Sequence, residues 1–221
     1  MNRYLEAGVI TIALLAVIFS VIGLLDNSRI SSLDMDVEHL NIQSESNRIL
    51  FFYNQVFTPE KNPEYCEIIN QSATLRSDEA DFLFSRLVTF EEANLMGNYE
   101  NLKKRYLLSR IELWLYTTLL ADSCETNMVP ILYFYTGKKT CVECSVQGGI
   151  LDDLRRECPN VKIFALSVDE DIDLVPLLQA QFGVTTVPSL VINNEQVFSK
   201  LTTKEELLNI ISCGEIASIT S

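Results

Sequence analysis

The pattern of hydrophobic and polar positions divides the chain into three parts. Residues 7–25, AGVITIALLAVIFSVIGLL, are apolar and carry no charge. Within residues 26–128, apolar side chains recur every three or four positions, which is the period of an α-helix. From residue 129 to residue 221, short apolar runs alternate with amphipathic segments, as in domains that alternate strands and helices. We therefore expect a short tail (residues 1–6), an apolar helix, a helical spacer or cap region and an α/β domain.

The apolar run has nearly the length of a membrane-spanning helix. At about 1.5 Å per residue it covers most of a hydrocarbon core of roughly 30 Å. A cleaved signal peptide is the alternative, but its apolar region is typically about 7–15 residues, and the sequence GLLDNSR that follows has no small-residue cleavage site. We interpret residues 7–25 as a single-pass transmembrane anchor. Arg3 and Arg29 flank it evenly, so the basic residues do not set its orientation.

The helical region is predicted to contain three helices. The first covers Ile30 to Phe57, and the second covers SDEADFLFSRLVTFEEANLM with Ser77 as its N-cap. A loop around MGNYEN separates the second helix from the third. The apolar stripe of the third helix comprises Leu102, Tyr106, Ile111, Leu113, Trp114 and Leu120. We expect the aromatic residues Phe82, Phe84, Phe90 and Trp114 to form the core of this helical part.

The C-terminal part is predicted to contain four strands and three helices. The strands are VPILYFYT, VKIFALSV, PSLVIN and QVFSKL, the last two forming a hairpin across Asn193-Asn194-Glu195. The helices are SVQGGILDDLRREC, DLVPLLQAQFG and TKEELLNIIS, the last with Thr202 or Thr203 as N-cap and Gly214 beyond its end. This order predicts a mixed sheet with helices on both faces.

Charge and cysteine content restrict the class of partner and the cellular compartment. The chain has 30 acidic and 17 basic residues, a net charge of −13, which argues against nucleic acid as a partner. The six cysteines, an even number, suit an oxidising compartment. The glycosylation triplet Asn70-Gln71-Ser72 is compatible with that location. We expect a cell-membrane protein whose soluble part lies outside the cytoplasm, with a Cys66–Cys124 disulfide across a hairpin of helices.

A C-x-x-C pair, Cys141 and Cys144, lies between the first predicted strand and the helix after it. The pair Val187-Pro188 precedes the third strand. Together these two features, in this order, resemble the thioredoxin-like superfamily over about residues 129–213. The resemblance implies a four-stranded mixed sheet with flanking helices and a cis bond before Pro188.

The resemblance also implies roles for individual residues. Cys141 would be the nucleophile and Cys144 the resolving thiol, while Val187 and Pro188 would contact an extended substrate. The family topology further places Cys158 and Cys213 at the same end of the sheet, either as a disulfide or as two separate buried thiols.

The residues around the motif suit thiol chemistry in part. A helix N-terminus stabilises the thiolate that attacks a disulfide, and Lys138 and Lys139 add positive charge, whereas Glu143 opposes them. Three features depart from the family. Thr140 replaces a tryptophan, the strand LYFYT lacks an acid, and Gly148-Gly149 replaces a proline that bends the helix.

Three functions remain open on the sequence. A zinc site would need two further ligands, and the one histidine, His39, is distant in sequence. An inert scaffold that docks partners is the second alternative. We expect instead a membrane-anchored thiol–disulfide oxidoreductase, without a cofactor, that acts on protein thiols and disulfides. Its electrons would be exchanged with another membrane protein, and the sequence leaves their direction open.

Overall fold

A computed structural model of the chain describes residues 8, 10–21, 63–92, 99–124, 126–137 and 141–214. These residues belong to two units, Met1–Thr58 and Pro59–Ser221. The predicted helix from Ile30 to Phe57 and the residues of the MGNYEN loop before residue 99 lie outside the described residues.

In the first unit, residues 10–21 are helical and their apolar side chains are exposed. The other residues of the predicted anchor, apart from residue 8, lie outside the described residues. Within the described part of the chain, no helix combines the length and the apolar character that crossing a membrane requires.

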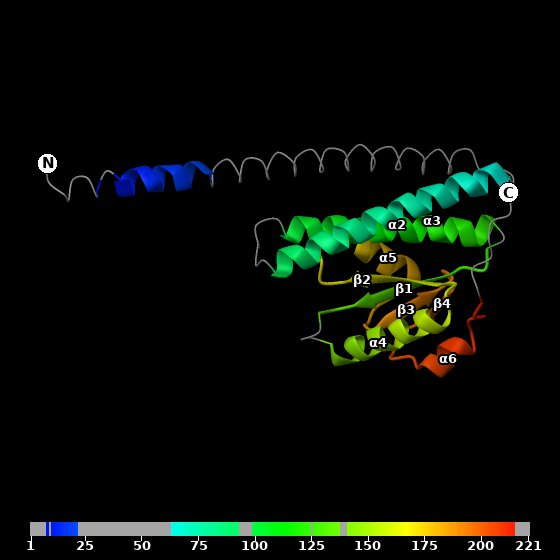
Figure 1. Cartoon of the computed structure of the whole chain (residues 1–221). Helices are drawn as coiled ribbons and strands as arrows, with labels where there is room; N and C mark the ends of the chain where they lie inside the picture. Colours follow the sequence, from blue (N-terminus) through cyan, green and yellow to red (C-terminus); the bar gives the residue numbers. More distant parts are fainter. Residues whose placement is uncertain are drawn as a thin grey trace. The chain divides into compact units, whose positions relative to one another are not determined.

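The second unit is built on a four-stranded sheet with the order β2-β1-β3-β4 (Figure 1). Strands β1 (Val129–Tyr135) and β2 (Val161–Ser167) are parallel. Strand β3 (Ser189–Ile192) runs antiparallel to β1, and β4 (Gln196–Phe198) runs antiparallel to β3. All four strands were predicted from the sequence, and their mixed pairing fits a thioredoxin-like fold.

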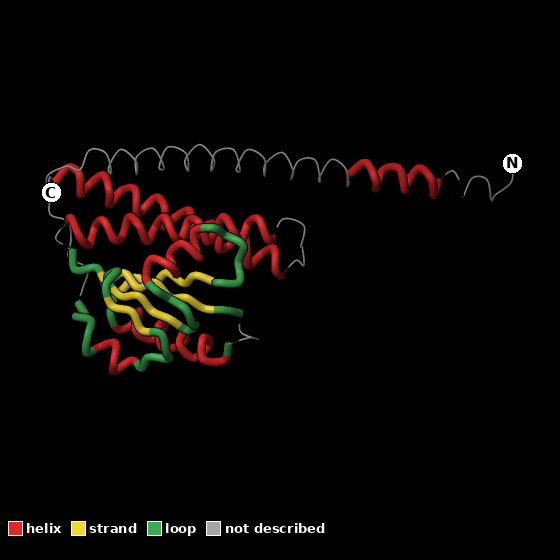
Figure 2. The backbone as a smooth tube through the Cα atoms, turned by 180° about the vertical axis from the view of Figure 1, so that it is seen from behind, coloured by secondary structure: helices red, strands yellow, loops and turns green. Residues whose placement is uncertain are grey.

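Helices cover both faces of this sheet (Figure 2). Side chains alternate across a strand, so Leu132 and Phe134 of β1 point to one face and Ile131 and Tyr133 to the other. The first face is covered by α3 (Tyr99–Ser123) and α5 (Leu174–Phe182), and α2 (Pro63–Glu92) adds to the same hydrophobic core. The second face is covered by α4 (Val142–Glu157) and α6 (Lys204–Leu208).

The ends of the shorter helices follow their local sequence. The Thr203 hydroxyl accepts the amide N–H of Glu206, and the Glu206 side chain accepts the amide N–H of Thr203, which together form a capping box at the start of α6. Helix α5 ends at Gly183, whose φ of 65° is readily adopted only by glycine. Thr203 was one of the two N-caps predicted for the last helix.

Helices α2 and α3 form a hairpin that packs on the sheet. The side chains that α2 buries recur at helical spacing: Cys66, Ile69, Ala73, Ala80, Leu83 and Leu87. The predicted stripe of α3 is confirmed at Ile111, Leu113, Trp114 and Leu120, which are buried. The predicted domain boundary at residue 128 stays a prediction, but the hairpin and the sheet share one core.

Two predictions for the hairpin are wrong. Helix α2 begins at Pro63 rather than with Ser77 as N-cap, because the buried face continues without a break through the residues before Ser77. Phe82 and Phe84 are 43% and 53% exposed, because they lie to either side of the buried Leu83 on the helix surface. Arg86 lies over the Phe82 ring, and Phe84 contacts the ring of Tyr106.

A buried charge cluster lies between α2 and α3. Arg76 is 1% exposed and forms ion pairs with Glu79 and Glu112. Burial raises the pKa of Glu112, and Glu79 acts in the same direction, whereas Arg76 opposes both. The hairpin therefore carries a polar contact within its otherwise apolar interface.

Candidate functional site

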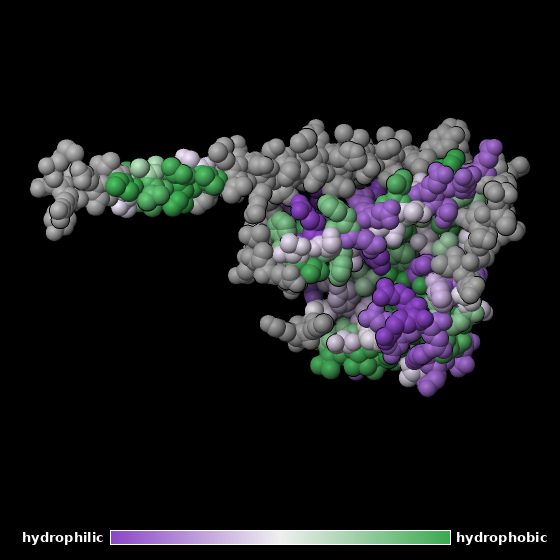
Figure 3. Space-filling view, in the orientation of Figure 1, coloured by the Kyte–Doolittle hydropathy of each residue, from purple (hydrophilic) through white to green (hydrophobic). Residues whose placement is uncertain are grey.

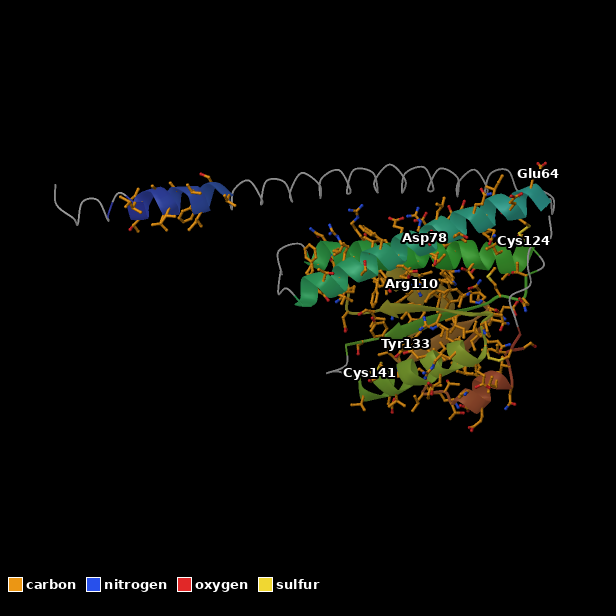
Figure 4. The ribbon with its side chains drawn as sticks, viewed as in Figure 1. Glu64, Asp78, Arg110, Cys124, Tyr133 and Cys141 are labelled. Atoms are coloured by element: carbon orange, nitrogen blue, oxygen red, sulfur yellow. A yellow bond between two sulfur atoms is a disulfide. The ribbon has the colours of Figure 1, made fainter. Side chains whose placement is uncertain are left out.

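The C-x-x-C pair lies where the chain leaves the sheet and begins α4 (Figure 4). Cys141 is the N-cap of the helix, with extended backbone, and its Sγ accepts the amide N–H of Cys144 at 3.0 Å. The two cysteines form a disulfide with their Cα atoms 5.3 Å apart. The predicted position of Cys141 at a helix N-terminus is confirmed.

The two cysteines differ in accessibility. Cys141 is half-buried, whereas Cys144 is only 3% exposed, because the first turn of α4 directs it into the core between the helix and the sheet. Val142 and Val146, on the same helix, are 76% and 48% exposed. Figure 3 shows a hydrophobic patch at the beginning of α4 and a hydrophilic one over its second half. Exposed apolar side chains therefore lie beside the accessible sulfur of Cys141.

The unpaired amide groups of the first helical turn supply positive potential at Cys141. Glu143 lies in that turn and opposes it. Lys138, Lys139 and Thr140 lie outside the described residues.

Tyr133 supports the motif from the sheet. Its hydroxyl donates a hydrogen bond to the backbone carbonyl of Cys144, and its ring stacks on Tyr135 with centroids 5.4 Å apart. Burial, together with Tyr135, raises the pKa of Tyr133 to about 12, so its hydroxyl keeps its proton at neutral pH. This residue was not among those predicted from the sequence. The alternation of β1, which points Tyr133 to the face that α4 covers, is the signal that could have found it.

Gln147 is a second supporting residue that the sequence analysis missed. It is fully buried, and its side-chain amide accepts the N–H of Thr202 at 2.7 Å and donates to the carbonyl of Thr202 at 3.2 Å. These two bonds fix α4 to the segment that precedes α6. Helix α4 itself runs without a break through Gly148 and Gly149, and a Cβ added at either glycine would meet no atom within 4 Å.

Val187 and Pro188 lie at the same end of the sheet as the dithiol. The bond between them is cis, as the sequence predicted. Pro188 is buried and Val187 half-buried. Ser189, the first residue of β3, pairs with Phe134 near the end of β1, after which the chain turns toward Cys141. The structure thus places both sequence features at the same end of the sheet.

The four other cysteines form two disulfides. Cys66, near the start of α2, is bonded to Cys124, just after α3, with Cα atoms 5.6 Å apart. Cys158, at the end of α4, is bonded to Cys213, with Cα atoms 4.8 Å apart. The structure brings together the same two pairs that the sequence predicts.

Two sequence features have no counterpart at this site. The glycosylation triplet, Asn70 to Ser72, lies within α2, and Ser72 is buried. His39 lies outside the described residues, and among the residues that the structure describes no group of three or more histidine, cysteine or acidic side chains could hold a metal ion.

The chain was compared with protein families, curated proteins and solved structures. No family model matches the chain, and a search of curated proteins finds no match. Among solved structures the chain is similar to thioredoxin-2, a component of the malaria parasite protein secretion machinery, with 19% identity and a TM-score of 0.32. The match covers 38% of this chain and 80% of that one. At this TM-score the similarity carries no argument of its own, so the fold assignment rests on the sheet order and on the position of the dithiol.

Proposed function

We propose that the protein is a membrane-anchored thiol–disulfide oxidoreductase that exchanges disulfides with protein substrates. The observation that carries the proposal is the asymmetry of the C-x-x-C pair. A partly exposed Cys141 caps α4, and a buried Cys144 lies within bonding distance of it. A purely structural disulfide needs neither the helix N-terminus nor one accessible sulfur.

The reaction would proceed in two exchange steps. In the dithiol form, the Cys141 thiolate attacks one sulfur of a substrate disulfide, forms a mixed disulfide and displaces the other substrate sulfur as a thiolate, which takes up a proton. Cys144 then loses its proton, and its thiolate attacks Cys141 Sγ, closes the Cys141–Cys144 disulfide and displaces the second substrate sulfur as a thiolate, which takes up a proton. Two electrons pass from the protein to the substrate, and the same steps in reverse oxidise a substrate dithiol.

The helix N-terminus would favour Cys141 as the attacking group. A free cysteine with a pKa near ~8.5 is mostly protonated at neutral pH, and amide groups directed at the sulfur stabilise its anion. The amide N–H of Cys144 already points at Cys141 Sγ. The sulfur of Cys144 is buried, so a substrate disulfide cannot reach it. Cys144 is therefore suited to resolve a mixed disulfide rather than to form one.

The surface beside Cys141 would favour unfolded or extended protein substrates. Val142 lies within the motif and Val146 two residues after it, and Val187 precedes the cis bond at the same end of the sheet. An extended chain lying across these side chains would bury apolar surface, which is favourable by about 25 cal/mol per Å².

We further propose that residues 7–25 anchor the protein in the cell membrane with residues 26–221 outside the cytoplasm. Two disulfides besides the active pair suit an oxidising compartment. A single helix carries no redox group, so a second membrane protein would supply or accept the electrons.

Trapping of mixed disulfides tests the proposed reaction. Cys144→Ala keeps the first step and removes the second, so substrates should accumulate on Cys141 as high-mass bands that disappear on reduction. Cys141→Ala is the matched control and should give no such bands, because the remaining sulfur is buried. An absence of bands from both variants would favour the scaffold alternative, and bands from Cys141→Ala alone would reverse the two roles.

A further inference from the structure

A hollow of about 450 Å³ follows the outer edge of β2, the end strand of the sheet. Helices α2 and α3 form one wall, and the end of α4 with the start of β2 forms the other. The dithiol lies beyond the end of β1, whereas the hollow includes Val161, the first residue of the parallel strand β2. The two sites are therefore at different ends of the sheet. The volume lies within the range of small-molecule sites, about 300–1,000 Å³.

The hollow concentrates positive charge in an acidic protein. Arg110, Arg155 and Lys162 line it, against one acidic residue, Asp81. The whole chain has 17 basic and 30 acidic residues, so three cations beside one carboxylate reverse its general balance. Among the ion pairs formed within the described residues, none includes Arg110 or Lys162.

Arg110 is held in a fixed position between α3 and β2 (Figure 4). Its guanidinium donates a hydrogen bond to the carbonyl of Ile163 and lies 5.0 Å from the ring centre of Phe164. Burial is the main cause that lowers the pKa of Arg110, with Arg155 acting in the same direction and Tyr106 and Asp81 opposing it.

Lys162 is also partly buried at the hollow, and burial, followed by the nearby Arg155, lowers its pKa. Arg155 does pair with Asp152, at 3.6 Å, but both side chains are largely exposed, and such pairs contribute little. A purely structural role, in which Arg110 satisfies a backbone carbonyl on the outer edge of β2, would explain the position of Arg110 alone. It does not explain why two further cations face the same hollow.

We propose that this hollow binds a small organic anion, one with a phosphate or carboxylate group and an apolar body. The three cations would hold the anionic group through charge-assisted hydrogen bonds. The remaining lining fits the apolar body, since Ala73, Leu113, Leu120 and Phe164 are buried side chains at the hollow. An extended acidic peptide fits less well, because Arg110 already occupies the Ile163 carbonyl that an added strand would need.

Calorimetric titration of the full-length disulfide form in detergent with phenyl phosphate tests the site. We expect saturable binding of one molecule per chain, weakened about tenfold or more by Arg155→Gln and by Lys162→Gln, because each removes a charge-assisted contact. Arg156→Gln is the matched control. It lies next to Arg155 on α4, is exposed, pairs with Asp153 and does not line the hollow.

Four outcomes would overturn the proposal. The first is the absence of saturable heat on titration with phenyl phosphate at low salt. Arg155→Gln and Arg156→Gln could weaken binding equally, which would mean that only net charge matters. Inorganic phosphate could bind as tightly as phenyl phosphate, which would remove the role of the apolar lining. A tetraglutamate peptide binding more tightly than phenyl phosphate would indicate a peptide site. None of these outcomes depends on the exchange activity of Cys141 and Cys144.

Discussion

At the scale of single residues, the dithiol depends on side chains that are remote in sequence. Tyr133 reaches the backbone of Cys144 from the sheet, and Gln147 fixes α4 to Thr202. Both contacts are made to backbone groups, so their partners leave no mark in the sequence. This is why the C-x-x-C pair could be predicted, whereas the residues that position it could not.

Tyr133→Phe tests the first of these contacts. The change keeps the ring and removes the hydrogen bond that the Tyr133 hydroxyl donates to the backbone carbonyl of Cys144. We expect a loss of about 1–2 kcal/mol in the free energy of unfolding, measured by denaturant titration. Tyr135→Phe, the same change two positions further along β1, should cost less. Equal losses for the two variants would mean that the Tyr133 hydroxyl has no special role.

Glu112 gives a pH-dependent prediction. Because its pKa is raised in the folded state, the folded protein binds the proton more tightly than the unfolded chain does. Stability should therefore fall as the pH rises from the ordinary value of 4.5 into the raised range. Denaturant titrations across this window should show that the free energy of unfolding of Glu112→Gln increases relative to that of the wild type as the pH rises. A gain that shrinks with rising pH would contradict the shift.

At the scale of elements, the strands were easier to predict than the limits of the helices. Short apolar runs such as those of β1 and β2 are largely buried in a sheet that has helices on both faces. Helix α2 was harder, because Ser77 resembles an N-cap although it lies in the middle of a 30-residue helix. Phe82 and Phe84 were assigned to the core because they are aromatic. Their exposure depends on where α3 lies, which the periodicity of α2 alone does not reveal.

The Cys66–Cys124 disulfide joins the two helices of the α2–α3 hairpin. Removing this disulfide should lower the stability of the protein. The bond closes a loop with a sequence separation of 58, so replacing both cysteines with serine should lower the free energy of unfolding by about 4 kcal/mol in the chain-entropy model. Unfolding in denaturant measures the difference. Under strong reductant the variant and the wild type should unfold together. A difference that persists there would assign the loss to the serine side chains.

At the scale of the whole molecule, the sequence predicted the α/β part well and the helical part less well. The mixed four-stranded sheet followed from the alternation of strands and helices, and the cis bond at Val187–Pro188 from a motif with a fixed place in a known fold. The packing of the hairpin on the sheet had no such motif. It depends on apolar side chains of α3, such as Ile111 and Trp114, meeting Phe164 and Leu166 on the sheet. Those contacts join distant parts of the chain, and one sequence does not record them.

We expect the part of the protein after residue 26 to lie outside the cytoplasm, and proteolysis tests this orientation. Protease added to intact cells or spheroplasts should degrade the part after residue 26, because we expect it outside the cytoplasm. A cytoplasmic marker protein in the same cells should survive. Full protection, with cleavage only after lysis, would place the dithiol on the other side of the membrane.

The order of the three disulfides has a consequence for how the chain matures. The six cysteines pair in sequence order, first with second, third with fourth and fifth with sixth, so Cys66–Cys124, Cys141–Cys144 and Cys158–Cys213 follow one another without interleaving. When the chain enters an oxidising compartment in order from its N-terminal to its C-terminal residues, both cysteines of one pair arrive before the first cysteine of the next pair. An oxidant that simply joins neighbouring thiols as they emerge therefore produces the native set. We accordingly expect the yield of native protein during export to depend on a disulfide donor and to be insensitive to loss of a disulfide isomerase.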